Sequence, residues 1–367
     1  MIINLLKHTM VALVMLLPFS AEAANSRSQD HSMHPVYSGY EFGKDAKVID
    51  FAVQPLAVPI GVTAEVMKRD TILRKALGEL GMEIRFHPFM KGADINFFLK
   101  QGDIEAATAG DMPVITAAAE TDITVTALAK RGFSSIISKG HLQLSELKGL
   151  RVGFPEGSTA HYTLLIALSQ YGMSDADIIM VPLNVDKLIS ELENGKIDAF
   201  SAYEPVPAIA LAGNKDFTVI MKYLNTTYLY FSKPFIDNYR EAASAILASH
   251  VRALRWMIRD KRNLLKACGW NIDAVKELSG KGMDLSVDKL AEIVRSDILN
   301  ISSSPSIPQR DLADSGYVQR VFNMLKKHQK VHPSAKLEKV ISSFDNSMIK
   351  EVLIHPVKFR LNDFDYK

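Results

Sequence analysis

The chain has 367 residues, 47% of them hydrophobic, and a formal net charge of +2 at pH 7. So small a charge excludes a surface built to bind polyanions, and nucleic acid is therefore not an expected partner. The single cysteine, Cys268, excludes an intrachain disulfide, so stability has to come from a buried core. The length and the apolar content are enough for two compact units.

The first 23 residues are predicted to be a secretory signal. A basic start, the apolar run at 10–19 and the Ala-Glu-Ala sequence at 21–23 follow the order of such signals. The run is too short for a membrane anchor, because a transmembrane helix needs about 20 apolar residues. We expect cleavage after Ala23 and export to the periplasm. Residues 24–46 are polar and lack an apolar period, so they are predicted to be a flexible leader.

Residues 47–128 are predicted to form the first part of one α/β lobe. Short apolar runs typical of buried strands alternate there with segments of helical spacing. The strands are expected at residues 48–53, 82–86 and 104–109, and the helices at 61–80, 93–101 and 110–119. This alternation is the order of a parallel sheet with helices on both faces.

Residues 129–222 repeat this pattern on a smaller scale and are predicted to form a second lobe. Its strands are expected at 151–154, 178–181 and 197–201, and its helices at 158–171 and 185–194. Segments near 127–133 and 220–223 indicate that the chain crosses from the first lobe to the second and back. A double crossing of this kind makes a hinge.

Residues 223–367 are predicted to return to the first lobe and to end in a helical extension. Its helices are expected at 239–266, 272–279, 286–296, 311–328 and 335–344. Several arginines recur at helical spacing in the first of these segments and are predicted to form a solvated face. They are Arg252, Arg255, Arg259 and Arg262.

Short motifs follow one another in both lobes. In the first lobe they are Gln101-Gly102-Asp103-Ile104-Glu105 and Thr108-Ala109-Gly110-Asp111-Met112-Pro113. In the second they are Leu147-Lys148-Gly149, Gly157-Ser158-Thr159-Ala160-His161, and Gly195-Lys196-Ile197-Asp198-Ala199 with Tyr203-Glu204-Pro205. In this order they resemble the periplasmic binding proteins of ABC importers for aliphatic sulfonates, taurine, nitrate and thiamine-pyrimidine precursors. Tyr203-Glu204 departs from the Trp-Asp pair that is usual in that family.

The resemblance covers roughly residues 47–225 and implies a two-lobed periplasmic-binding-protein fold of type II. That α/β fold has parallel or mixed sheets with helices on both faces, and C-terminal helices would follow it here. The resemblance also implies a binding protein rather than an enzyme, with a permease in the inner membrane and its cytoplasmic ATPase as partners. No cofactor is expected.

Two helix starts are candidates for the ligand site, because the crevice of an open α/β sheet lies beyond the carboxyl ends of the strands. Gly110 precedes the backbone donors of Asp111 and Met112, although Asp111 could instead be an N-cap. Gly157 precedes a second set of donors, which are those of Ser158, Thr159 and Ala160. Free N–H groups and the helix dipole favour negative oxygen at both places. One such site in each lobe would let a small anion bridge the lobes.

Five other side chains complete the candidate site. Gln54, Phe89 and Tyr203 could line the crevice, with core packing as the alternative. His161 could donate to a bound oxygen or pack against the neighbouring strand. Glu204 would repel a plain anion, which argues for a ligand that also carries a cationic or donor group. Pairing of Glu204 with a lysine or arginine is the alternative.

We therefore expect a periplasmic component of an ABC importer that captures a small oxyanion-bearing solute, such as a sulfonate or taurine, by closure of two lobes. A thiamine-precursor pyrimidine or a related heterocycle is the alternative ligand. A ligand sensor for a membrane receptor and an enzyme on the same fold are the alternative classes. The sequence lacks the motifs G-x-S-x-G and H-E-x-x-H. No metal site is predicted, because no thiol accompanies the histidine pairs at 31 and 34 and at 328 and 332.

Overall fold

The structure is a computed structural model that describes residue 31, residues 34–43 and residues 47–367. The predicted signal, its cleavage after Ala23 and the start of the predicted leader lie outside the described residues. Within the described part, none of the helices combines the length and the apolar character that a membrane crossing requires.

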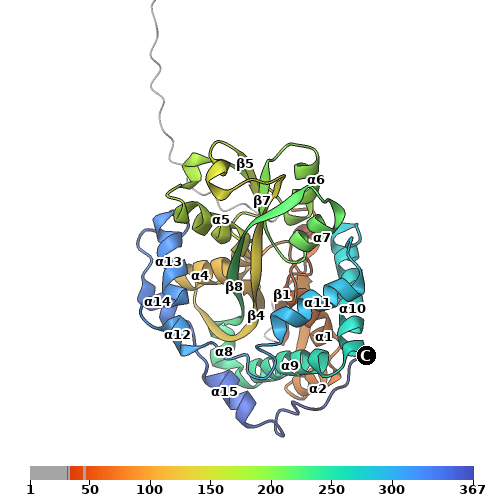
Figure 1. Cartoon of the computed structure of the whole chain (residues 1–367). Coiled ribbons are helices and arrows are strands. Elements are labelled where there is room, and N and C mark those ends of the chain that lie inside the picture. Colours follow the sequence, from red (N-terminus) through yellow and green to blue (C-terminus); the bar gives the residue numbers. More distant parts are fainter. Residues whose placement is uncertain (1–30, 32–33, 44–46) are drawn as a thin grey trace, which may run out of the picture. The chain divides into compact units, whose positions relative to one another are not determined.

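The described residues form one mixed sheet of 8 strands in the order β2-β1-β3-β8-β4-β7-β5-β6 (Figure 1). The strands are β1 (Val48–Val53), β2 (Glu83–Pro88), β3 (Ala106–Gly110), β4 (Ile123–Lys139), β5 (Arg151–Phe154), β6 (Ile179–Pro182), β7 (Ala199–Tyr203) and β8 (Phe217–Ser232). β1 is parallel to β2 and β3, and β5 is parallel to β6 and β7. We call the part of the fold around β1–β3 the first lobe and the part around β5–β7 the second lobe.

The long strands β4 and β8 join the two lobes. They pair antiparallel along their whole length, from Ile123 with Ser232 to Lys139 with Phe217. β3 pairs with the part of β8 near Ser232, whereas β7 pairs with the part of β4 near Lys139. The predicted crossing segments 127–133 and 220–223 therefore lie inside these two strands. Figure 1 shows β4 and β8 side by side through the middle of the molecule.

Helices pack against the sheet in both lobes and confirm the predicted α/β class. In the first lobe they are α1 (Ile60–Lys68), α2 (Thr71–Glu79), α3 (Gly92–Gln101) and α4 (Asp111–Glu120). In the second they are α5 (Thr159–Gln170), α6 (Leu188–Glu193) and α7 (Val206–Gly213). The predicted helix 61–80 is divided, because the Asp70 carboxylate accepts hydrogen bonds from the amides of Ile72 and Leu73 and starts α2.

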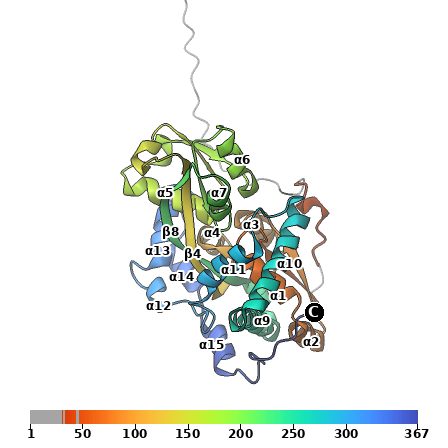
Figure 2. The same cartoon turned by 45° about the vertical axis from the view of Figure 1, so that its right-hand side comes forward.

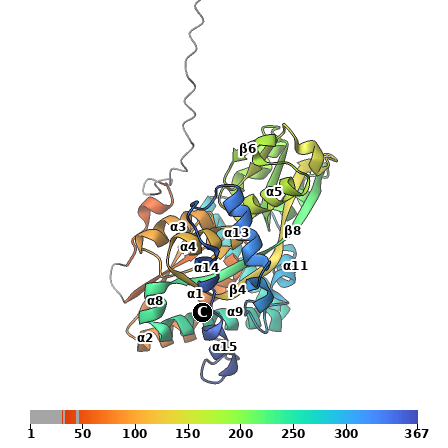
Figure 3. The same cartoon turned by 90° about the vertical axis from the view of Figure 1, so that its left-hand side faces the viewer.

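The C-terminal part is helical, as predicted. Its helices are α8 (Lys233–Asn238), α9 (Arg240–Arg259), α10 (Lys261–Ser279), α11 (Val287–Ile298), α12 (Gln309–Leu312), α13 (Tyr317–Lys327), α14 (Leu337–Ser342) and α15 (Ser347–Ile354). The predicted helix 239–266 ends early, because Asp260 caps a new helix, α10. α9 packs against α1 and α2 of the first lobe, and α10 packs against α1 (Figure 2). α13 packs against α4 and α5 (Figure 3).

Residues 34–43 pack onto the first lobe, so the prediction of a flexible leader is wrong for them. The Tyr37 side chain is 2% exposed and its hydroxyl donates to Asp94 Oδ2 at 2.6 Å. The same hydroxyl accepts from the Met90 amide at 2.9 Å. The Tyr37 ring lies 4.9 Å from the ring of Phe89 between centroids. The packing of this segment could not be predicted from the sequence. Its aromatic residues stand singly among polar ones and show neither a helical nor a strand period.

The mutation Tyr37→Phe is expected to lower the free energy of unfolding by about 1–3 kcal/mol, because the buried Asp94 carboxylate and the Met90 amide each lose a partner. Urea unfolding measures the effect. Tyr171→Phe is the control, because the Tyr171 side chain is 54% exposed. If both variants unfold at the urea concentration of the wild type, residues 34–43 do not contribute to stability through Tyr37.

Candidate functional site

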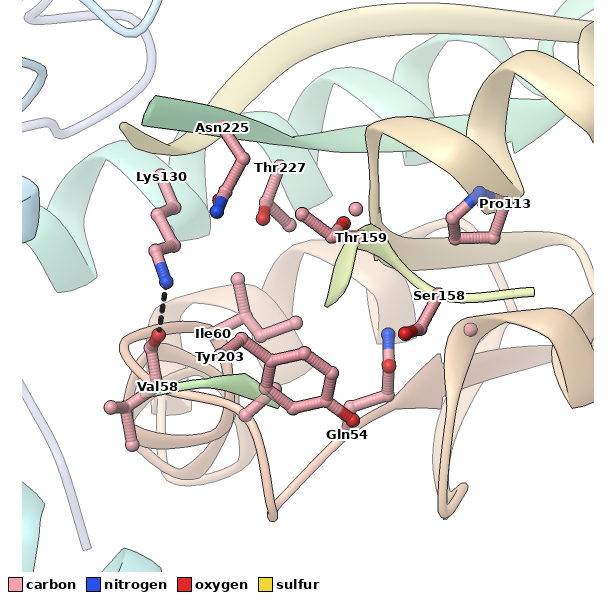
Figure 4. Close-up of a pocket in the computed structure, with 13 residues that line it drawn as sticks. Gln54, Val58, Ile60, Pro113, Lys130, Ser158, Thr159, Tyr203, Asn225 and Thr227 are labelled. Atoms are coloured by element: carbon pink, nitrogen blue, oxygen red, sulfur yellow. Dashed lines mark hydrogen bonds between the residues drawn. The ribbon is translucent and has the colours of Figure 1, made fainter. Parts of the chain in front are cut away.

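A cavity lies where the N-terminal tips of α4 and α5 meet (Figure 4). It holds about 380 Å³ of space free of atoms, including solvent at its mouth. The part of this space that can hold the centre of a water molecule is about 30 Å³. Its wall is built from the first lobe, the second lobe and both crossing strands. A small solute in this place would touch both lobes.

Four of the predicted site residues line this cavity: Gln54, Ser158, Thr159 and Tyr203. The Gln54 amide is fixed, because its Nε2 donates to the Thr108 carbonyl oxygen at 2.8 Å. The Tyr203 hydroxyl is buried and has no hydrogen-bond partner among the described residues. It is therefore available to a bound solute. Figure 4 shows Gln54 and Tyr203 at the lower edge of the space, with Ser158 beside Gln54 and Thr159 above them.

Gly110 brings the tip of α4 against Thr159 of α5, and Gly157 brings the turn before α5 against Ala93 of α3. A Cβ added to Gly110 would overlap the Thr159 hydroxyl oxygen. Gly157 has a φ of +71°, and a Cβ there would lie 2.6 Å from the Ala93 Cβ. Glycine permits both the left-handed turn and the close approach. The structure therefore brings the two predicted helix tips to one shared cavity.

Ser158 caps α5 with its side chain. Its Oγ accepts from the amides of Ala160 at 3.2 Å and His161 at 3.4 Å, and donates to the Pro155 carbonyl oxygen at 2.6 Å. The Ala160 amide is thus already paired and its side chain is 0% exposed, so the predicted ligand contact of Ala160 is wrong. The Thr159 amide has no acceptor among the described residues. As the first N–H of the helix it is the donor left for a ligand.

Asp111, Met112 and Phe89 are buried and do not line this cavity. Asp111 is 0% exposed, and its carboxylate accepts from the Met112 amide at 2.7 Å, the Thr226 amide at 3.4 Å and the Tyr317 hydroxyl. Burial raises the pKa of this carboxyl, and the hydrogen bonds from Tyr317 and Thr159 counteract that rise. Asp111 therefore anchors the α4 tip.

His161 packs inside the second lobe and is absent from the cavity lining, which favours the predicted alternative of packing against the neighbouring strand. Its ring lies 4.5 Å from the Phe154 ring between centroids. Its Nδ1 accepts from the Gly157 amide at 3.2 Å, which fixes the turn before α5. Burial lowers the pKa of His161 to about 3, so the ring is neutral at physiological pH.

Glu204 also does not line the cavity, and it lies close enough to Lys130 to interact with it, which is the predicted alternative of pairing with a lysine. The carboxylate accepts from the Ala208 amide at 3.3 Å in the first turn of α7. Burial raises the pKa of Glu204, and nearby Lys130 opposes the rise. The argument that the ligand needs a cationic group therefore loses its basis.

The sequence interpretation missed three lining residues on the crossing strands: Lys130, Asn225 and Thr227. Lys130 is the one charged residue among the described residues that line the cavity. Its side chain is 4% exposed, and Nζ donates to the Val58 carbonyl oxygen at 3.1 Å and lies 3.4 Å from Asp297 Oδ2. Figure 4 shows Lys130, Asn225 and Thr227 pointing into the space. A lysine inside the otherwise apolar run 127–130 was the available signal.

Comparison with known proteins finds chains of similar sequence and fold. Residues 99–271 match the NMT1-like family. The taurine-binding periplasmic protein of Escherichia coli K12 is 30% identical over 172 residues, which are 46% of this chain and 51% of that protein. The chain thus matches about half the length of this curated relative.

Solved structures match over more of the chain. The periplasmic aliphatic sulphonate binding protein SsuA from Escherichia coli has a TM-score of 0.57 at 18% identity, over 80% of this chain and 96% of that one. The periplasmic nitrate-binding protein NrtA from Synechocystis PCC 6803 has a TM-score of 0.62 at 12% identity, over 85% and 90%. Residues 99–271 are thus similar to the NMT1-like family, and the chain has the fold of the periplasmic binding proteins.

Proposed function

We propose that this protein is the periplasmic solute-binding component of an ABC importer and captures a small anion of the sulfonate class between its lobes. The observation that carries the proposal is the cavity that joins two helix N-termini to one buried cation, Lys130. Its role is binding and not catalysis, in line with the printed names of its relatives. A permease in the inner membrane and its cytoplasmic ATPase are the proposed partners.

Closure of the lobes is the proposed binding step. We place the lobe boundaries at 128/129 and 222/223, which fall inside β4 and β8. Two helix dipoles contribute about 0.3–1 kcal/mol each, or up to about 2 when partly buried, whereas a micromolar dissociation constant requires about 8 kcal/mol. Hydrogen bonds to the anion from Lys130, the Thr159 amide and the Tyr203 hydroxyl contribute the rest of the binding free energy. Each bond that involves a charged group contributes about 1.5–3 kcal/mol.

The charge of the lining favours an anion without an amino group. Lys130 is a cation, and the other described lining residues include no carboxylate. The ammonium group of taurine would therefore meet no carboxylate in the lining itself, because Asp297 already pairs with Lys130, whereas the hydroxyl of isethionate needs no opposite charge. A thiamine-precursor pyrimidine is the alternative ligand, because the Tyr203 ring borders the cavity and offers an apolar face.

Isothermal titration calorimetry on the mature protein tests this function with isethionate, ethanesulfonate, taurine, nitrate and the pyrimidine. We expect isethionate to bind more tightly than taurine. The mutation Lys130→Gln should weaken binding of the sulfonates by about 10-fold, the loss of one charge-assisted hydrogen bond. Lys222→Gln, at an exposed position of β8, is the matched control and should bind like the wild type. If only the pyrimidine binds, the anion proposal is wrong.

A further inference from the structure

Helix α13 of the C-terminal extension packs against one helix from each lobe. It contacts α4 of the first lobe and α5 of the second (Figure 3). These are the two helices whose N-terminal tips meet at the cavity. α13 is therefore placed to act on the relative position of the lobes.

The start of α13 is bonded to the first lobe. Tyr317 is its first residue, and the Tyr317 hydroxyl donates to Asp111 Oδ2. Asp111 is the first residue of α4 and also accepts from the Thr226 amide of β8. The residue before it, Gly110, lines the cavity and touches Thr159. The Tyr317 hydroxyl therefore fixes the α4 tip without touching the solute space.

One ion pair and one histidine–carboxylate contact extend this connection. Asp311 of α12 pairs with Arg131 of β4, next to Lys130. At the other end of α13, Nδ1 of the C-cap residue His328 lies 3.7 Å from Oδ1 of Asp175, in the second lobe. α13 is thus attached to the first lobe at one end, to the second lobe at the other, and to a crossing strand through α12.

We propose that α13 is a latch that holds the two lobes closed before the solute arrives, with Tyr317 as the positioning residue at its first-lobe end. All of the contacts that carry this inference are made by the chain itself, so the latch can act without a ligand. Entry and exit of the solute then both require α13 to release one of the lobes. The latch therefore slows both association and dissociation of the solute.

Single-molecule energy transfer between dyes on the two lobes tests the latch without any ligand. Dyes are attached at Lys100→Cys in α3 and Glu193→Cys in α6, both of which are exposed positions. The native thiol does not interfere, because Cys268 is 0% exposed and burial raises its pKa to about 12. The unliganded wild type should give mainly the high-transfer, closed population.

The mutation Tyr317→Phe removes only the hydroxyl and should raise the ratio of open to closed molecules about 10-fold, which corresponds to one hydrogen bond to a charged acceptor. His328→Gln, at the C-terminal end of α13, should also raise the ratio of open to closed molecules. Tyr230→Phe is the control, because the Tyr230 hydroxyl is buried and has no partner among the described residues. It should leave the distribution unchanged.

The kinetic part of the test rests on the proposed function and uses isethionate in stopped flow. Tyr317→Phe should speed both association and dissociation, whereas a merely structural defect would not speed association. Unchanged transfer distributions in both Tyr317→Phe and His328→Gln would overturn the latch. If Tyr317→Phe opens the lobes but no sulfonate binds the wild type, the latch stands and the proposed solute class fails.

Discussion

Replacement of Arg252 by methionine is expected to lower the free energy of unfolding by about 3–5 kcal/mol. Arg252 lies on α9 with its side chain 3% exposed, and its Nε and Nη2 donate to Asp70 Oδ2 at 3.0 and 2.7 Å. Its Nη1 donates to the Phe359 carbonyl oxygen at 2.9 Å. Without the guanidinium, the Asp70 carboxylate is left buried beside no opposite charge, which is the costly case for a buried ion pair.

Chemical denaturation of Arg252→Met and Arg255→Met measures this difference on one helix. The bond of Arg255 is to Asn362 at the exposed surface, so its loss should change stability by less than about 1 kcal/mol. The prediction that the arginines of α9 form one solvated face is therefore wrong for Arg252. If the two variants are equally stable, the buried pair contributes nothing. The double mutant Arg252→Met with Asp70→Asn should recover part of the loss, although it weakens the cap of α2.

Replacement of Gly110 by alanine is expected to weaken binding of the solute by up to about 100-fold, which corresponds to the upper end of the roughly 1–3 kcal/mol cost of overpacking. Gly110 has a φ of −70°, which alanine adopts freely, so the backbone is not strained. The new methyl group would meet the Thr159 hydroxyl across the interface of the two tips. It therefore opposes closure and leaves each lobe intact.

Calorimetry and thermal unfolding of the same sample separate these two effects. The control is Gly78→Ala in α2, where an added Cβ meets nothing within 4 Å. It should leave affinity unchanged and stabilise the protein by about 0.5–1 kcal/mol through helix propensity. Wild-type affinity in Gly110→Ala would mean that the solute binds without contact between the tips.

The short elements of the fold could be predicted from sequence, and the long crossing strands could not. β5 lies where its apolar run predicts it, at 151–154, and a glycine-containing turn limits it. β4 has 17 residues, and most of them are buried. A strand that is covered on both faces has no alternating pattern, so only its middle, near 127–133, was noticed as a crossing.

Only part of the candidate site could be predicted, because local sequence patterns show backbone donors but do not show side-chain packing. Helix starts after glycine identify Thr159 and Gly110 as places for an anion, because backbone donors are a property of the chain itself. Whether a side chain such as Phe89 faces the cavity or the core depends on packing that no local pattern contains. Lys130 was not predicted as a site residue, because the strand that carries it, β4, was not predicted as a strand.

The pairing between β4 and β8 is irregular near Lys130. The register shifts between Val125 and Ala127, between Leu128 and Lys130, and between Ile136 and Ile137. Irregularities of this kind increase local twist, and a two-stranded ribbon tolerates large twist. The two strands could thus twist when one lobe rotates, without loss of the hydrogen bonds between them. Lys130 stands at one of the shifts, so torsion of this ribbon would act on the strand position that carries the charge of the cavity.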